Sequence, residues 1–161
     1  MHLDEAAFLS TQWERALESA TRDLRAVEAG FEQRLRAHLD ALALAGPRAA
    51  ERLLLPALTG DDPERLRVAG AALLKMGEPP QVESVVQALV EGKPASRQDV
   101  QRALQLEWRE ELTERLRPLL SAAEPPVQVA ALEVFRFHGL PPGVRLSEWM
   151  ALPVVMAVMN S

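Results

Sequence analysis

The chain of 161 residues has no cysteine, no tyrosine and no isoleucine, and aromatic residues make up only 4% of it. Without cysteine the protein has no disulfide bond, no thiolate zinc site and no cysteine nucleophile. The small share of β-branched and aromatic residues disfavours sheets, because these residue types pack best in strands. Leucine and alanine, which favour helices, together supply 51 residues. The composition therefore predicts an all-α protein.

Positive charge is also in short supply. Lysine and arginine number 18 against 23 aspartates and glutamates, so the net charge is -5 and the pI is about 5.3. The electric field of this net negative charge repels phosphate backbones and anionic membrane surfaces, so we expect neither nucleic acid nor membrane as a partner. The first residues lack the basic and apolar pattern of a signal peptide. We expect a cytoplasmic protein.

Apolar residues recur at helical spacing from the start of the chain. Residues 4–20 and 23–45 each place them three and four positions apart, which predicts two amphipathic helices that pair antiparallel. Gly46-Pro47 ends the second helix, and a third is expected from Pro47 to Leu58, since proline suits a helix start. We therefore predict that residues 1–46 form an N-terminal helical pair that caps the remainder.

From residue 47 onward the sequence repeats with a period of 31 residues. Helical segments open at the equally spaced prolines Pro63, Pro94 and Pro125. Two columns of apolar residues keep the same spacing on the second helix of each unit: Leu54, Val85 and Leu116, and Leu58, Leu89 and Leu120. A fixed period with two helices per unit is typical of an α-solenoid, in which neighbouring units bury the apolar faces. The pattern predicts about three repeats over 47–161, the last of them incomplete.

An offset of 62 residues, which is two repeats, supports the same register, and the unit between the two aligned ones departs from the pattern. It aligns Gly77 with Gly139 and Pro56 with Pro118. In the middle unit Trp108 stands where the other two units have glycine. We therefore expect the unit near residues 94–108 to be irregular or kinked.

One stretch of the repeat region carries a recognisable motif. Its segments are Leu55-Pro56-x-Leu58, Gly60-Asp61-Asp62-Pro63, Leu66-Arg67-Val68-Ala69 and Ala72-Leu73-Leu74-Lys75-Met76-Gly77. This stretch resembles a HEAT repeat, with a helix-end proline, an aspartate at the turn, an arginine early in the next helix and a closing leucine and glycine. The resemblance implies a right-handed α-solenoid whose second helices line a concave face.

The N-terminal region has a resemblance of its own. Residues 2–9 and 35–42 are similar to the start of a bacterial HEAT-like family found near type VI secretion genes. That resemblance implies accessory or adaptor work in secretion and no known chemistry.

No set of residues indicates catalysis, a cofactor or a metal. The three histidines His2, His38 and His138 lie far apart in sequence, and none has the spacing of helical metal ligands. Acidic residues cluster at Glu107, Glu110, Glu111 and Glu114, but Arg115 and Arg117 accompany them, as on a solvated helix face. Phosphate loops, serine elbows and nucleotide fingerprints are missing from the sequence. We expect no enzyme activity and no bound cofactor.

The predicted functional surface is a protein-binding one with two parts. In the repeat register a column of charged residues lies opposite the apolar columns: Arg52, Glu83, Glu114 and Arg145. The C-terminal tail adds an apolar edge: Trp149, Met150, Val154, Val155, Met156 and Met159. Terminal repeats normally have a polar outer face, so this edge indicates the continuation of a longer solenoid, a tail folded back over the last repeat, or contact with a second copy or a partner. The apolar run over 149–159 is too short to span a bilayer.

We therefore predict a non-catalytic scaffold or adaptor that binds protein partners, in the secretion context that the resemblance implies. Two alternatives stay open: a HEAT-like enzyme similar to bilin lyases or DNA glycosylases, and a self-assembling homo-oligomeric solenoid. A DNA-binding solenoid needs a basic concave stripe, whereas the predicted column carries two arginines and two glutamates. For a lyase, no residue indicates a tetrapyrrole site.

Overall fold

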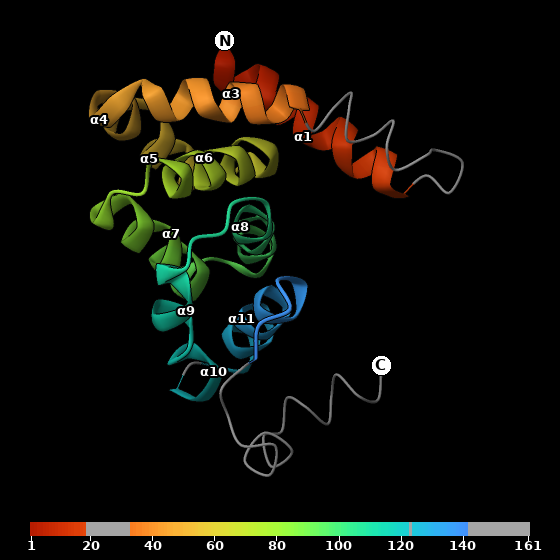
Figure 1. Ribbon diagram of the computed structural model, residues 1–161, viewed down its shortest axis with the longest axis vertical. Coiled ribbons are helices and arrows are strands. Elements are labelled where there is room, and N and C mark those ends of the chain that lie inside the picture. The colour runs from red at the N-terminus through yellow and green to blue at the C-terminus, as the bar shows by residue number, and fades with distance from the viewer. Residues whose placement is uncertain (19–32, 123, 142–161) are drawn as a thin grey trace. The chain divides into compact units, whose positions relative to one another are not determined.

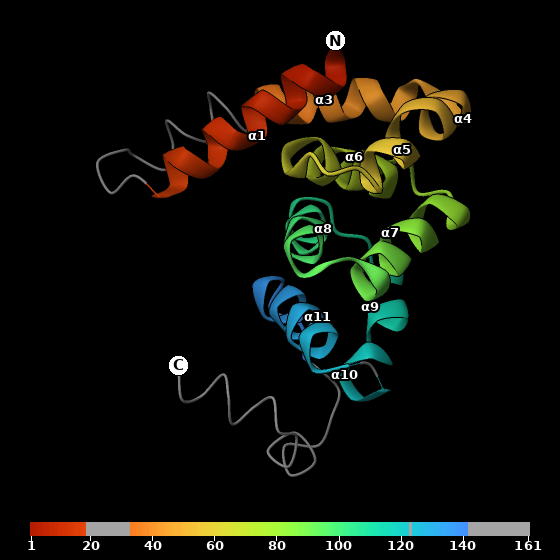
Figure 2. The same ribbon diagram turned by 180° about the vertical axis from the view of Figure 1, so that it is seen from behind.

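The computed structural model describes residues 1–18, 33–122 and 124–141, and within these ranges every regular element is helical (Figures 1 and 2). In chain order the elements are α1 (His2–Glu18), α3 (Gln33–Leu44), α4 (Gly46–Ala49), the π-helix η2 (Ala50–Leu54), α5 (Leu55–Leu58), α6 (Pro63–Met76), α7 (Pro79–Glu91), α8 (Pro94–Leu106), α9 (Glu111–Leu116), α10 (Leu119–Ala122) and α11 (Pro125–Phe137). The predicted all-α class is confirmed for these residues. The chain divides into two compact units, Met1–Trp108 and Arg109–Ser161.

The N-terminal unit begins with two helices that pack on each other. Helices α1 and α3 run in opposite directions, and both pack against α6 (Figure 1). The buried stripe of α3 consists of Leu35, Leu39 and Leu42, which follow the three- and four-residue spacing of an amphipathic helix. The two helices predicted over 4–20 and 23–45 correspond to α1 and α3, although residues 19–32 lie outside the described part of the chain.

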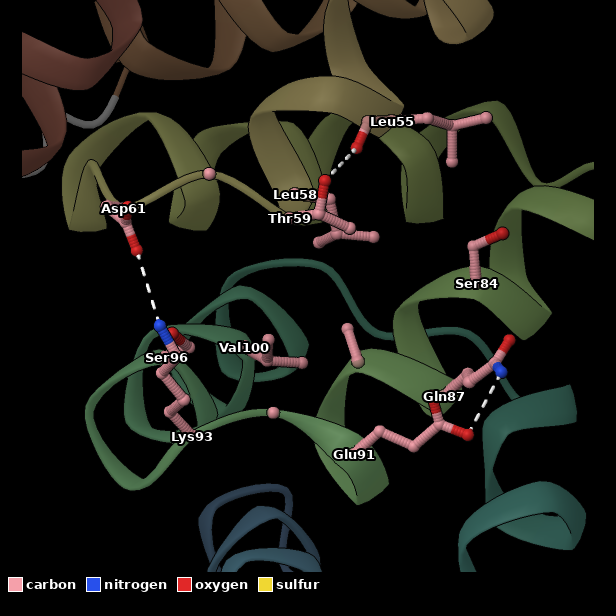
Figure 3. Close-up of a pocket in the computed structure, with 13 residues that line it drawn as sticks. Leu55, Leu58, Thr59, Asp61, Ser84, Gln87, Glu91, Lys93, Ser96 and Val100 are labelled. Carbon is pink, nitrogen blue, oxygen red and sulfur yellow. Dashed lines mark hydrogen bonds and ion pairs between the residues drawn. The ribbon is translucent and has the colours of Figure 1, made fainter.

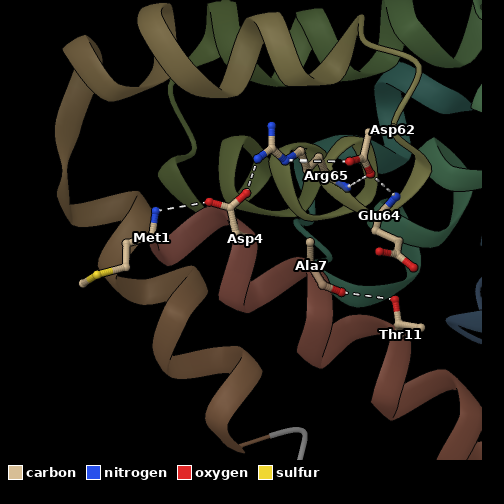
Figure 4. Close-up of polar contacts among 7 residues, drawn as sticks. All are labelled: Met1, Asp4, Ala7, Thr11, Asp62, Glu64 and Arg65. Carbon is tan, nitrogen blue, oxygen red and sulfur yellow. Dashed lines mark hydrogen bonds and ion pairs between the residues drawn. The ribbon is translucent and has the colours of Figure 1, made fainter.

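The predicted repeat starts are confirmed as helix starts. Helices α6, α8 and α11 begin at Pro63, Pro94 and Pro125, each at the first helical position. Proline suits this position because its missing N–H has no partner there and its φ is already helical. At α6 the preceding Asp62 caps the helix, since its Oδ1 accepts hydrogen bonds from the backbone N–H groups of Glu64 at 3.1 Å and Arg65 at 3.0 Å (Figure 4).

Helices that are one repeat apart lie side by side in the N-terminal unit. Helix α6 packs on α8, and α5 packs on α7 (Figure 2). The six residues of the predicted apolar columns are buried, with at most 4% of each exposed: Leu54, Leu58, Val85, Leu89, Leu116 and Leu120. The 31-residue register thus identified the core positions of the second helices correctly.

Two prolines interrupt second helices at equivalent places. Pro56 cannot donate to the carbonyl four residues earlier and would collide with it in a regular α-helix. The chain widens just before this point into η2, where the N–H of Leu55 donates to the carbonyl of Ala50, five residues back. Pro118, its equivalent at an offset of 62, falls in the break between α9 and α10. Helix α7 has Gln87 at the corresponding place and continues without a break.

The glycines at the offset of 62 also have equivalent roles. Gly77 ends α6 with a φ of 72°, and Gly139 follows α11 with a φ of 64°. These left-handed conformations suit glycine, which has no Cβ to clash. The middle helix α8 runs from Pro94 to Leu106 as one helix, so the expected irregularity is absent from its interior. The unit departs from the repeat pattern at the end of this helix, where the backbone of Glu107 is extended with a φ of -123°.

Ion pairs on the surface connect the N-terminal helices to α6. Arg65 donates to the Asp4 carboxylate, which also lies 3.2 Å from the Met1 ammonium group (Figure 4). These two hydrogen bonds, that of Arg65 first, hold the pKa of Asp4 below its usual value.

A second set of ion pairs surrounds Lys75. Its Nζ lies 2.9 Å from Asp40 Oδ1 and 3.3 Å from Glu107 Oε1. Burial alone lowers the pKa of Lys75, but the two carboxylates outweigh it and raise the pKa above its usual value.

The close contact between α6 and α8 depends on Gly70. A Cβ on Gly70 would lie 2.9 Å from the Cβ of Ala103, which is fixed to its own backbone. Overpacking costs about 1–3 kcal/mol, while alanine gains about 1 kcal/mol in helix propensity over glycine. We expect Gly70→Ala to lower the free energy of unfolding by about 1 kcal/mol in urea denaturation.

The double variant Gly70→Ala/Ala103→Gly provides the control for this prediction. It restores the clearance between the two helices, so it should be more stable than the sum of the two single changes indicates. Strict additivity of the two changes would show that the helices do not meet at these residues.

Candidate functional site

Three of the four residues of the predicted charged column lie in the described part of the chain. Arg52 lies on η2 and Glu83 on α7, and both are exposed. Glu114 lies on α9 in the C-terminal unit, also exposed, with its Oε1 4.0 Å from Nη2 of Arg117. The remaining predicted residues lie outside the described residues: Arg145, Trp149, Met150, Val154, Val155, Met156 and Met159.

A pocket of about 460 Å³ lies between α5, α7 and the start of α8 (Figure 3). We call it the α5–α7–α8 pocket. Helical residues and the residues of two turns line it: Leu55, Leu58, Thr59, Gly60, Asp61, Ser84, Gln87, Ala88, Glu91, Gly92, Lys93, Ser96 and Val100. Its volume falls in the range of about 300–1,000 Å³ that is usual for ligand-binding pockets.

The pocket has an apolar lining and a polar rim. Of the apolar lining residues, Leu55 and Ala88 are half-buried and keep accessible surface, whereas Leu58 and Val100 are 4% and 0% exposed. Asp61, Glu91 and Lys93 stand at the rim and are exposed (Figure 3). Apolar surface together with a few placed polar groups is usual in ligand-binding pockets.

Hydrogen bonds and ion pairs order the rim. Gln87 Nε2 donates to Glu91 Oε1 at 3.1 Å, one turn further along α7. Lys93 Nζ lies 3.7 Å from Asp61 Oδ1, so this pair joins the two turns that border the pocket (Figure 3). Among the lining residues two carboxylates stand against one ammonium group, which leaves the rim with one excess negative charge.

The side chain of Arg97 stabilises the turn between α7 and α8 through hydrogen bonds to backbone carbonyl groups. Arg97 Nε donates to the carbonyl of Leu89 at 2.9 Å, and its Nη2 donates to the carbonyl of Gly92 at 2.8 Å. These bonds satisfy carbonyl groups at the end of α7 that have no partner within the helix. Gly92 is needed here because an added Cβ would lie 2.4 Å from the carbonyl oxygen of Ala88. The wall of the pocket is therefore rigid at this end.

The pocket lies on the same helix as Glu83 of the predicted column, although the sequence analysis did not identify the pocket. Gln87 and Glu91 lie four and eight residues after Glu83, so the three share one face of α7. The two turns that border the pocket are one repeat apart, because Gly92 and Lys93 stand 31 residues after Asp61 and Asp62. The 31-residue period was the signal that could have placed them side by side.

A second group of polar residues gathers where α1 begins. His2 Nδ1 lies 3.2 Å from His38 Nδ1, and His38 Nδ1 lies 3.5 Å from Glu5 Oε2. The three side chains offer ligand atoms that all lie within 4.8 Å of one another. These are residues that could hold a metal ion, and sequence spacing missed them because His2 and His38 are 36 positions apart.

Within the described ranges, no helix combines the length and the apolar character that crossing a membrane requires. The resemblances to HEAT repeats and to a family near secretion genes stay predictions from the sequence. Comparisons of the chain with models of protein families, with curated proteins and with solved structures gave no match.

Proposed function

We propose that this protein is a non-catalytic scaffold that binds a segment of a protein partner in the α5–α7–α8 pocket. The observation that carries the proposal is a pocket with accessible apolar surface at Leu55 and Ala88 under a polar rim. Protein interfaces draw most of their affinity from a few bulky side chains that fill such pockets, while a polar rim excludes water.

The rim defines the chemistry of the segment. The excess negative charge comes from Asp61 and Glu91, and the whole chain carries a net charge of -5. A segment with a lysine or arginine beside an apolar anchor residue complements both features. The partner is therefore a polypeptide with a basic residue next to a bulky apolar one.

The packing of helices supports a HEAT-like solenoid as the frame of this scaffold. Helix α6 on α8 and α5 on α7 place successive repeats side by side in the N-terminal unit. We extend this arrangement to a right-handed stack over 47–161, capped by the helical pair of 1–46. The type VI secretion context stays a prediction from the sequence resemblance.

A displayed library of random peptides provides the test. Peptides are selected on the full chain, and their affinity is then measured for wild type, Ala88→Phe and Val90→Phe. Ala88 lines the pocket, so a phenyl group there fills it, whereas Val90 lies on the same helix and is not among the lining residues. We expect Ala88→Phe to lose at least about tenfold in affinity, since losing a buried anchor costs about 2 kcal/mol or more.

Selected peptides should share a bulky apolar residue next to lysine or arginine. They should bind Val90→Phe as well as wild type, and circular dichroism should show both variants folded. Glu91→Gln, which keeps the hydrogen bond to Gln87, should slow association and weaken its salt dependence. Selection without any enriched sequence, or equal affinity for Ala88→Phe and wild type, would rule the pocket out.

A further inference from the structure

The cluster of His2, Glu5 and His38 has the spacing of zinc ligands. Two ligand atoms that each lie about 2.0–2.1 Å from zinc at the tetrahedral angle are about 3.3 Å apart. The two separations measured here are 3.2 Å, between His2 Nδ1 and His38 Nδ1, and 3.5 Å, between His38 Nδ1 and Glu5 Oε2. One ion can therefore contact all three side chains with small rotations of their ends.

We propose that His2, Glu5 and His38 bind one zinc ion that joins the first turn of α1 to α3. Two imidazoles and one carboxylate are a ligand set that Zn²⁺ accepts, with water in the fourth position. Imidazole favours zinc over the hard cations Mg²⁺ and Ca²⁺, which take oxygen ligands. The site is separate from the α5–α7–α8 pocket and goes beyond the proposed binding of a partner.

The surroundings of the cluster are compatible with a cation. The start of a helix carries partial positive charge, which opposes metal binding, and the Met1 ammonium group adds to it. Asp4 counters the ammonium at a distance of 3.2 Å. Glu5 is itself a ligand, and it brings negative charge to the first turn of α1. The side chain of His38 is only 21% exposed, so its ring is already partly fixed before a metal binds.

A zinc ion here would connect two helices whose ligands are far apart in sequence. Between the ligands on α1 and the one on α3 lies the whole connection of the helical pair. A metal that binds the folded state and not the unfolded state adds to stability according to its concentration and affinity. The site would therefore fasten the helical pair of residues 1–46.

Titration calorimetry with Zn²⁺ on the tag-free, chelator-treated full chain tests the proposal. We expect one zinc ion per chain, and a weakening of at least about tenfold in His2→Gln and in His38→Gln, because even outer groups that support a ligand contribute about 10–100-fold to affinity. His138→Gln changes the remaining histidine of the chain, which lies after α11, and should bind zinc as wild type does.

A thermal melt provides a second readout. Zinc should raise the Tm of wild type and of His138→Gln, and at the same concentration it should raise the Tm of His38→Gln much less. Circular dichroism of the metal-free variants shows whether each is folded. No saturable binding to wild type, or equal affinity for wild type and both ligand variants, would overturn the proposal.

Discussion

Replacing Arg67 by methionine should lower the free energy of unfolding by about 3–5 kcal/mol in urea denaturation, because it removes the positive charge that pairs with a buried carboxylate. Arg67 on α6 is 8% exposed, and its Nη2 donates to Asp99 Oδ1 on α8 at 3.0 Å. Its Nη1 donates to Ser10 Oγ on α1 at 3.4 Å. One guanidinium group thus connects three helices of the N-terminal unit.

Two further variants separate the possible causes of this loss. Arg65→Met removes an arginine from the same helix, but the Arg65–Asp4 pair is exposed, and exposed pairs contribute little. The double variant Arg67→Met/Asp99→Leu removes both buried charges and should recover most of the lost stability. If Arg67→Met were no more harmful than Arg65→Met, the buried pair would not hold these helices together.

Replacing Phe135 by alanine should cost about 3–5 kcal/mol, the usual loss when a buried phenyl group leaves a cavity. Phe135 lies on α11 in the C-terminal unit and is 0% exposed. It belongs to the buried stripe of that helix, together with Val127, Ala130, Ala131 and Val134. Urea denaturation followed by circular dichroism measures the loss.

Phe137 provides the matched control on the same helix. It is 57% exposed, so Phe137→Ala removes the same group from the surface and should change stability by less than about 0.5 kcal/mol. Similar losses for Phe135→Ala and Phe137→Ala would mean that α11 does not pack through the face described here.

The sequence predicts the core of the fold because that information is local and periodic. Proline at a helix start and apolar residues three or four positions apart reflect the geometry of a single helix. The 31-residue period then relates one helix to the next, and it places Leu54, Val85 and Leu116 in the core correctly. It also aligns Pro56 with Pro118, and both fall at breaks or widenings of second helices.

What the sequence does not predict depends on contacts between elements. The accessible apolar surface of the pocket comes from α5 and α7, and its rim from the end of α7 and two turns, so no single segment displays it. The contact between His2 and His38 depends on how α1 and α3 are aligned, and spacing along the chain does not encode that alignment. The unusual residue Trp108 predicted a distorted helix, but it lies after the end of α8 and leaves the helix regular.

Binding of a polypeptide in the α5–α7–α8 pocket should protect the backbone around that pocket from exchange with solvent. Amide hydrogen exchange of the full chain, alone and saturated with a selected peptide, tests it most directly. We expect slower exchange in the segments 55–61 and 84–100, which contain the lining residues, and unchanged exchange in α1 and α11. Protection confined to α1, α3 or α11, with none at the pocket, would contradict it.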